Sequence, residues 1–243
     1  MLDQFSRTEL LLGKAALEKL KNSRVAVFGV GGVGGYVVEA LVRSGIGAID
    51  IIDNDRVALT NLNRQIIATR DSIGRSKVEV MRERVLSINP DCAVTAHEMF
   101  FLPETADRLD FSKFDYVVDA IDTVTAKLEL IARSKAAGVP IICSMGTGNK
   151  LDPTMLEVCD IAKTSVCPLA RVMRLECRKH GFKNIKTVYS RENPVSPEPA
   201  LLRKCMDEEG AVKPIPASAS FVPPAAGLII ASEVVRDLCG IKK

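Results

Sequence analysis

A glycine-rich segment early in the chain has the spacing of a phosphate-binding loop. Gly29-Val30-Gly31-Gly32-Val33-Gly34 follows a short apolar run and opens an apolar helical pattern. Backbone N–H groups of such a loop, together with the start of the helix, bind phosphate. Gly29 and Gly31 would allow a tight turn and close backbone approach, and Gly34 would let helix and strand touch. The loop therefore predicts a nucleotide site, which NAD and ATP would fill equally well.

Two basic side chains distinguish between these nucleotides. Asp53 ends the next apolar run, where a carboxylate commonly accepts hydrogen bonds from ribose hydroxyls. Arg64 and Lys77 follow on the segment that leaves this run, placed to neutralise a triphosphate and its pyrophosphate leaving group. A lone Arg or Lys is usually a solvated surface charge. The pair behind Asp53 favours ATP, because a dehydrogenase needs neither cation.

A third apolar run ends in a pair of carboxylates, Asp119 and Asp122. A carboxylate at such a position can hold Mg²⁺ that bridges nucleotide phosphates. Asp122 is the predicted magnesium ligand because it lies further beyond the run, whereas Asp119 is expected to cap the turn or the next helix. Loop, cations and metal would stabilise the charge that builds on the phosphates of ATP as pyrophosphate leaves.

The elements that must position these residues alternate along the chain. Short apolar runs without polar alternation are typical of strands buried on both faces of a parallel sheet. Strands are expected at residues 25–28, 48–52, 93–96, 116–118, 140–142, 156–158 and 185–189, and helices at residues 10–21, 37–42, 77–88, 126–137, 168–179 and 225–238. This order predicts an α/β fold with a doubly wound, mostly parallel sheet of Rossmann type. Ligands of such sheets bind beyond the carboxyl ends of the strands, where each of these motifs lies.

Length and composition favour one domain. A chain of 243 residues can bury one substantial core, and 47% hydrophobic with 26% charged residues is ordinary for a soluble globule. We expect a single domain over residues 1–243, with a nucleotide-binding core at 1–150 and a substrate-side extension at 151–243. Within the extension, several prolines between residues 191 and 216 predict a mobile crossover.

Targeting and zinc signals are missing from the sequence. The first residues contain no basic stretch followed by an apolar run, so a cytoplasmic location is expected. The apolar run at 221–235 is interrupted by prolines and is shorter than the ~20 residues that span a bilayer, so no membrane association is predicted. The seven cysteines include no CxxC pair, which argues against structural zinc.

Taken in order, five motifs resemble the ThiF/MoeB superfamily, the adenylating relatives of ubiquitin-activating enzymes. They are the glycine loop, the segment DNDRVALTNLNRQ from Asp53, GRSKVE from Gly74, Asn89-Pro90 and DAIDT from Asp119. The resemblance covers roughly residues 4–148, and the ordered set is far more specific than the glycine loop alone.

This resemblance implies a role for individual residues. The loop glycines, with Asp53, Asp55 and Asn61, would bind ATP, Arg64 and Lys77 would contact its phosphates, and Asp122 would coordinate Mg²⁺. Arg7 matches an arginine that, in this superfamily, reaches the active site of the other subunit of a homodimer. A solvated cation at a helix start is the alternative for Arg7.

Later motifs narrow the resemblance to the tRNA threonylcarbamoyladenosine dehydratase branch of the superfamily. They lie at residues 146–154, 160–164 and 168–170. Such enzymes adenylate the threonyl carboxylate of a modified adenosine beside the anticodon, and the acyl-adenylate then cyclises with loss of water. No protein nucleophile is needed, so Cys167 is expected to be inert. The resemblance also implies a monovalent cation, Na⁺ or K⁺, and cooperation with cysteine desulfurase or sulfur-acceptor proteins.

Basic residues concentrate in one part of the extension, as a tRNA substrate would require. Between residues 163 and 191 eight Lys and Arg face one Glu, whereas the whole chain carries a net charge of only +3. We expect phosphate-backbone contacts, with salt-sensitive affinity, from Lys163, Arg171, Arg174 and Arg178. The three arginines fall on one helical face. A solvated helix face is the alternative.

Three other functions compete with this hypothesis. An activator of a ubiquitin-like sulfur-carrier protein, of the ThiF or MoeB kind, would share the adenylating motifs, but such enzymes often carry zinc-binding CxxC pairs. A NAD-linked oxidoreductase would leave Arg64 and Lys77 idle. A nucleotide-binding scaffold without catalysis would not need these cations or Asp122.

Overall fold

A seven-stranded sheet forms the centre of the molecule, in the order β3-β2-β1-β4-β5-β7-β6. The computed structural model describes residues 2–210, 212 and 214–241. The strands are β1 Arg24–Phe28, β2 Ala48–Asp53, β3 Ala93–Glu98, β4 Tyr116–Asp119, β5 Ile141–Ser144, β6 Leu156–Asp160 and β7 Lys186–Ser190. All pairs are parallel except β6 with β7. The expected doubly wound, mostly parallel α/β fold is confirmed.

Eight α-helices accompany the strands in the described part of the chain. They are α1 Ser6–Leu12, α2 Lys14–Lys21, α3 Gly34–Arg43, α4 Lys77–Ile88, α5 Val124–Ala136, α6 Pro168–Lys179, α7 Pro199–Glu209 and α8 Val222–Cys239. The single opening helix expected at 10–21 is wrong, since Gly13 adopts a φ of +85° that separates α1 from α2. Among the described helices, none has the length and apolar character needed to cross a lipid bilayer.

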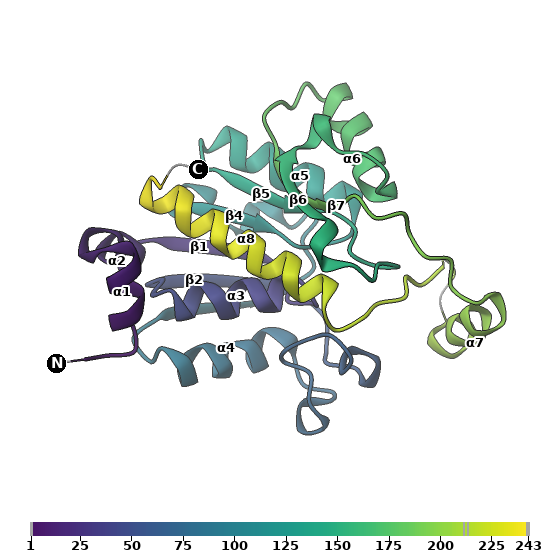
Figure 1. Cartoon of the computed structure of the whole chain (residues 1–243), viewed down its shortest axis with the longest axis horizontal. Helices are drawn as coiled ribbons and strands as arrows, with labels where there is room; N and C mark the ends of the chain where they lie inside the picture. The colour runs from purple at the N-terminus through teal and green to yellow at the C-terminus, as the bar shows by residue number, and fades with distance from the viewer. Residues whose placement is uncertain (1, 211, 213, 242–243) are drawn as a thin grey trace.

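The connection at 191–216 contains a helix that its prolines concealed. Pro199 occupies the first turn of α7, where its missing N–H costs no hydrogen bond, and Gly210 ends the helix in the left-handed conformation. Residues 211 and 213 lie outside the described residues. We call residues 191–221 the strap. Figure 1 shows it running past the carboxyl ends of the strands, with α7 furthest from the sheet and α1 and α2 at the opposite end.

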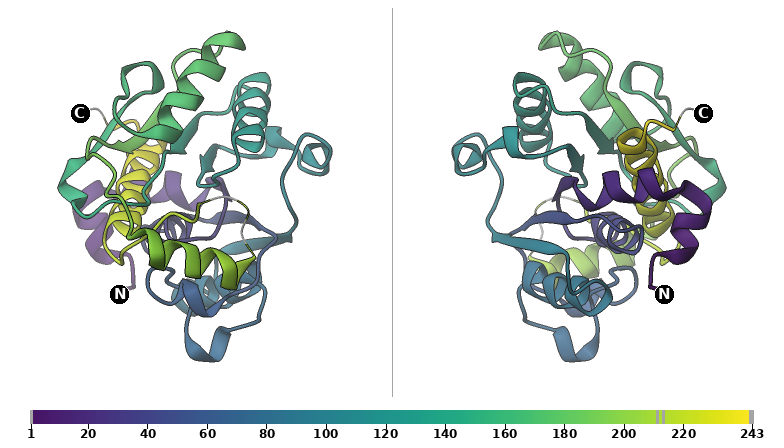
Figure 2. Two further views of the ribbon diagram at one scale, coloured as in Figure 1. Left: turned by 90° about the vertical axis from the view of Figure 1, so that its right-hand side faces the viewer. Right: turned by 90° about the vertical axis from the view of Figure 1, so that its left-hand side faces the viewer.

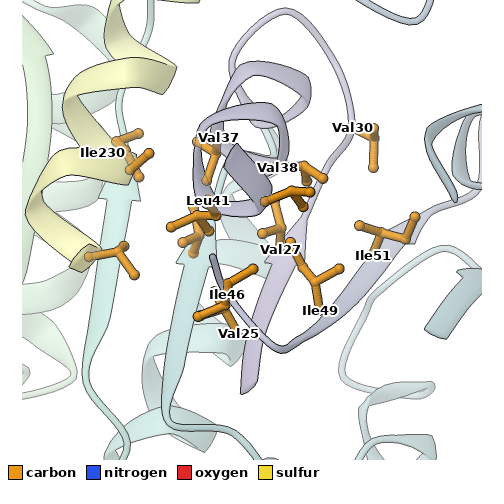
Figure 3. Packing of buried hydrophobic residues seen from close by; sticks show 14 of the residues in the cluster. Val25, Val27, Val30, Val37, Val38, Leu41, Ile46, Ile49, Ile51 and Ile230 are labelled. Carbon is orange, nitrogen blue, oxygen red and sulfur yellow. The ribbon is translucent and has the colours of Figure 1, made fainter. Parts of the chain in front are cut away.

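The strands bury side chains on both faces of the sheet, which explains their continuous apolar runs. Val25 and Val27 of β1 join one core cluster, whereas Ala26 and Phe28 join the other. Figure 3 shows the first cluster, in which helix α3 and Ile230 of α8 cover the sheet. Helices α5 and α6 supply the second. The two layers fix the strand ends that carry the motifs.

Strand register brings the motifs to one edge. Phe28, at the end of β1, pairs with Ile52 of β2 on one side and Asp119 of β4 on the other. Strand order reverses between β1 and β4, since β2 and β3 extend one way and β5 the other. Such a switch point opens a crevice beyond the strand ends.

Acidification is expected to weaken the fold through Asp50. Burial alone would raise the pKa of this carboxyl, but hydrogen bonds from His97 and Arg24 more than offset it and hold the pKa below 3.8. A lowered folded-state pKa contributes stability above about pH 4, and that stability is lost as pH falls through the folded value. In urea titrations between pH 6 and 3, Asp50→Asn should lose less stability than the unaltered protein. Equal losses in both proteins would contradict this assignment.

Candidate active site

The glycine loop turns sharply between β1 and α3. Gly29 has a φ of +88°, and its N–H donates to the carbonyl of Ile52 at 2.8 Å. The N–H of Val30 donates to the Asp53 carboxylate at 2.7 Å. Helix α3 then begins at Gly34, so its first turn faces the crevice. The loop has the local geometry that the sequence predicts for binding phosphate.

Gly34 and Gly31 serve different purposes, and alanine variants should separate them. A Cβ on Gly34 would lie 1.8 Å from the Gly29 carbonyl oxygen, whereas a Cβ on Gly31 meets no atom nearer than 3.8 Å. Gly34→Ala is expected to lower the free energy of unfolding by about 1–3 kcal/mol. Gly31→Ala should leave stability unchanged but weaken nucleotide binding, because the methyl group blocks approach to phosphate. Urea unfolding and nucleotide titration measure the two effects, and equal stability losses would contradict them.

Asp53, Asp55 and Lys77 form a connected group. The Asp53 carboxylate accepts the N–H groups of Val30 and Asp55, so it links the glycine loop to the segment after β2. Lys77, only 5% exposed, donates from Nζ to the Asp55 carboxylate at 2.8 Å. Its backbone N–H donates to the Asp55 carbonyl at 3.0 Å. These hydrogen bonds hold the start of α4 next to the carboxyl ends of the strands.

Arg64 lies beside the glycine loop. A Cβ added to Gly32 would lie 3.3 Å from the Cγ of Arg64, so the Arg64 side chain packs closely against the loop. Its guanidinium donates to the Thr60 carbonyl and to Asn63 Oδ1, each at 2.9 Å. Asn61 is buried and accepts the Ala58 N–H, which holds this turn in shape. Arg64 and Lys77, although separated in the sequence, therefore both lie near the glycine loop.

Asp122 follows β4 in a segment that packs on the glycine loop. A Cβ on Gly29 would meet the Ala120 carbonyl at 2.7 Å. Asp122 itself is exposed and lines the crevice. Among the described residues none forms a recorded ion pair or hydrogen bond with its carboxylate, and no three potential metal ligands cluster together. A single carboxylate fits Mg²⁺, which takes most of its other ligands from phosphates and water.

Asp119 has a larger role than the turn cap expected for it. Its carboxylate does accept the Ile121 N–H, at 3.3 Å, but it also forms an ion pair with Lys127 in which both side chains are fully buried. Lys127 Nζ donates to Asp119 at 2.9 Å, to the Ile121 carbonyl at 2.9 Å and to the Ser144 carbonyl at 2.8 Å. One ammonium therefore joins the ends of β4 and β5 and the residue before Asp122.

These residues line one cavity of about 700 Å³ beyond the strand ends. Its lining includes, among the predicted site residues, Gly29, Gly31, Gly32, Asp53, Asp55, Asn61, Arg64, Lys77 and Asp122. Gly34 lies behind the loop, in contact with Gly29, as its predicted packing role requires. A volume of this size suits a small-molecule ligand.

The segment after β5 and the strap form the remaining wall. Residues 144–150, 167–169, 194, 216 and 218 line this side. Asn149 has a φ of +58° and forms two hydrogen bonds with Ala217 of the strap. Its side-chain Oδ1 accepts the Ala217 N–H at 2.8 Å, and its own N–H donates to the Ala217 carbonyl at 2.7 Å. Cys167 lies buried on this wall at the start of α6. The Ser218 carbonyl of the strap also accepts the Asn63 side-chain amide at 3.0 Å, so the strap reaches from Asn149 to the segment that carries Arg64.

Sequence reasoning missed several residues of the site. Gln65 is buried on the cavity wall, and its Oε1 has no hydrogen-bond partner among the described residues. Lys127 and Lys150 are buried lysines, and a lysine is a residue type that is rarely fully buried. Gln65 directly follows Arg64, and this position was the only feature of the sequence that could have pointed to it.

Two predicted groups lie away from the cavity within one chain. Arg7 is exposed on α1, at the opposite end of the sheet from the strap (Figure 2). Lys163, Arg171 and Arg178 are exposed around α6, but Arg174 is half-buried and donates to the Thr164 carbonyl and hydroxyl at 2.6 and 2.7 Å. Arg174 therefore holds the connection before α6 and does not share a fully exposed face with the other arginines.

A Rossmann-type sheet with a glycine loop, two cations and several carboxylates at its switch point defines a class of nucleotide-binding proteins. The family model described as "ThiF family" matches residues 5–243, and the chain belongs to this family. Among curated relatives, the chain is 43% identical over 242 residues to the tRNA threonylcarbamoyladenosine dehydratase of Bacillus subtilis, covering 98% of this chain and 95% of that protein. The Escherichia coli dehydratase is 43% identical over 183 residues, covering 75% and 68%.

Solved structures give the same result. The E. coli dehydratase TcdA in complex with ATP superposes with a TM-score of 0.86 and 35% identity, covering 98% of this chain and 94% of that chain. Its complex with AMP gives a TM-score of 0.87 over the same shares. E. coli MccB with ATP, at 21% identity and a TM-score of 0.67, shares the fold. The likeness to the dehydratases therefore spans nearly the whole chain.

Proposed function

We propose that this protein is an ATP-dependent tRNA threonylcarbamoyladenosine dehydratase. It adenylates the threonyl carboxylate of the modified adenosine next to the anticodon and promotes its cyclisation. The observation that carries the proposal is the cavity at the β1/β4 switch point, which is lined by the glycine loop, Arg64, Lys77 and Asp122. Relatives of nearly the same length carry this activity in their names. The similarity to the adenylyltransferase/sulfurtransferase MoeZ covers only 54% of this chain, so activation of a sulfur carrier is not favoured.

ATP occupies the half of the cavity built from residues 28–77. The backbone N–H groups of the loop and the first turn of α3 bind phosphate oxygens, and the Asp53 carboxylate retains lone pairs for ribose hydroxyls. Arg64 and Lys77 neutralise the phosphates, with Lys77 turning from Asp55 toward the nucleotide. Asp122 would hold Mg²⁺, which when bound would neutralise charge on the pyrophosphate.

Two balanced steps complete the reaction. A carboxylate oxygen attacks the α-phosphorus, and the bond from that phosphorus to the bridging oxygen of pyrophosphate breaks. The carbamoyl group then attacks the activated carbonyl carbon, loses a proton and expels AMP. Cyclisation is intramolecular, so holding the two groups together gives a large effective concentration. No thiol is needed, which leaves Cys167 as a packed residue.

Further expectations accompany this function. Arg7 reaches the cavity of a second copy, so the active form is a homodimer that lends a cation in trans. Lys163, Arg171 and Arg178 contact the tRNA backbone, with Arg174 contributing least because Thr164 engages it. We expect a monovalent cation, Na⁺ or K⁺, as a further cofactor and cysteine desulfurase or sulfur-acceptor proteins as partners. The proposed location is the cytoplasm, where the tRNA substrate is found.

The direct test is to incubate the protein with ATP, Mg²⁺ and threonylcarbamoyl-modified tRNA, digest the tRNA and determine nucleoside masses. The expected product is the modified adenosine lighter by one water, formed only with ATP. Unmodified tRNA should give neither product nor AMP. Intact threonylcarbamoyladenosine after prolonged incubation would remove the proposal, and pyrophosphate exchange driven by a sulfur-carrier protein would replace it.

A further inference from the structure

Lys150 is a buried cation on the cavity wall that faces the glycine loop. It belongs to the segment after β5 and is only 3% exposed. Its Nζ donates to the backbone carbonyl of Glu192, in the strap. Among the described residues no carboxylate forms an ion pair with it. Burial of an ammonium without a negative partner is costly, so such a group usually signals a ligand or a local rearrangement.

The nearest acidic side chain is already engaged elsewhere. The Glu192 carboxylate accepts the N–H groups of Leu151, at 2.9 and 3.1 Å, and Asp152, at 2.9 Å. The neighbouring Cys167 thiol packs against the Gly146 carbonyl at 3.9 Å. Burial lowers the pKa of Lys150, and the nearby Cys167 and Glu192 only partly oppose this effect. The surroundings of Lys150 are therefore short of negative charge.

The position of Lys150 separates it from the nucleotide cations. Arg64 and Lys77 stand with the glycine loop, in the half of the cavity that ATP requires. Lys150 lines the cavity together with Cys167 and Leu169, in the half built from the segment after β5 and the start of α6. Because the carboxylate that attacks the α-phosphorus has to lie within bonding reach of it, a second anionic group must enter the cavity beside the nucleotide.

We propose that Lys150 binds the carboxylate of the tRNA-borne substrate and aims it at the α-phosphorus of ATP. This inference rests on the proposed function. The charge-assisted hydrogen bond orients the nucleophilic oxygen. After AMP transfer the same ammonium lies beside the carbonyl oxygen, which gains negative charge as the carbamoyl group attacks, and it stabilises that charge. Lys150 is thus a catalytic residue of the substrate half.

The test compares binding of an acid and its ester. An anticodon stem-loop RNA carrying threonylcarbamoyladenosine is titrated into the full-length protein, alongside the same RNA with the carboxylate as its methyl ester. The unaltered protein should bind the acid on the order of 10-fold more tightly. Lys150→Met and Lys150→Gln should bind both RNAs equally, at the affinity of the ester. Lys150→Arg should restore part of the preference.

Control variants separate carboxylate binding by Lys150 from a purely structural role and from a nonspecific effect of positive charge. Lys150→Gln keeps a donor for the Glu192 carbonyl, so a purely structural lysine would be rescued by it. Lys113→Met removes an exposed lysine that pairs with Asp110 and should keep the full acid preference. ATP affinity should be unchanged in all variants, and a loss in Lys150→Met with the acid preference intact would assign Lys150 to nucleotide phosphate and overturn the inference.

The same measurements distinguish failure of this inference from failure of the proposed function. If the unaltered protein turns over modified tRNA while Lys150→Met keeps its acid preference, this inference fails and the proposed function stands. If the unaltered protein neither converts modified tRNA nor prefers the acid, both fail together.

Discussion

Asp122→Asn is expected to lower kcat for modified tRNA by about 10²–10³-fold, while the protein still folds and binds ATP in the absence of metal. The carboxylate is exposed on the cavity wall and has no recorded partner among the described residues, so its removal leaves no buried group unsatisfied. Under the proposed function, the variant would lose the ability to hold Mg²⁺ on the phosphates. AMP release measured over a range of Mg²⁺ concentrations reports the effect, and Mn²⁺ affinity with ATP present gives a second readout.

A matched control makes this result specific. Glu104→Gln removes an exposed carboxylate outside the cavity and should leave kcat and Mn²⁺ affinity unchanged. Arg64→Ala should reproduce the loss in turnover but, unlike Asp122→Asn, should also weaken ATP itself. Full activity in Asp122→Asn would mean that the metal site has been assigned to the wrong residue.

Lys127→Met is expected to destabilise the protein by about 3–5 kcal/mol. The change removes the only cation of a buried ion pair and leaves Asp119 charged in the core, with the Ile121 and Ser144 carbonyls short of a donor. Urea unfolding measures the loss. Turnover should fall as well at temperatures where the variant stays folded, because the segment that carries Asp122 loses its anchor.

Lys135→Met on the same helix is the matched control. Lys135 is exposed and donates to the Lys183 carbonyl, so its loss should cost less than about 1 kcal/mol. Replacing both charges, as in Asp119→Leu with Lys127→Met, should recover part of the stability, because an apolar pair leaves no buried charge unpaired. A Lys127→Met loss no larger than that of Lys135→Met would contradict the role of this ammonium.

Local patterns were sufficient to predict most of the fold. The helices expected at 77–88 and 168–179 begin and end at those residues, where the first turn of each carries a clear start signal such as Pro168. The glycine loop, Asp53, Arg64, Lys77 and Asp122 meet at one cavity because parallel strands end at a common edge. That consequence of topology requires no knowledge of side-chain packing.

What the sequence did not reveal depends on tertiary contacts. In the sequence, Lys127 and Lys150 look like ordinary polar residues. They are buried only because β5 packs against Lys127 and the strap packs against Lys150. Helix α7 was hidden because prolines that stop one helix can start another. Arg174 keeps the periodicity of its neighbours, but the turn at Thr164 draws its guanidinium inward.

The central claim, that a substrate carboxylate is joined to AMP in this cavity, is tested most directly by following oxygen. Modified tRNA labelled with ¹⁸O in the threonyl carboxylate is converted with unlabelled ATP, and the released AMP is weighed. Attack of the carboxylate on the α-phosphorus, followed by expulsion of AMP, predicts one ¹⁸O atom in every AMP formed with the cyclised product. AMP without the label, or ADP in its place, would contradict the adenylation mechanism.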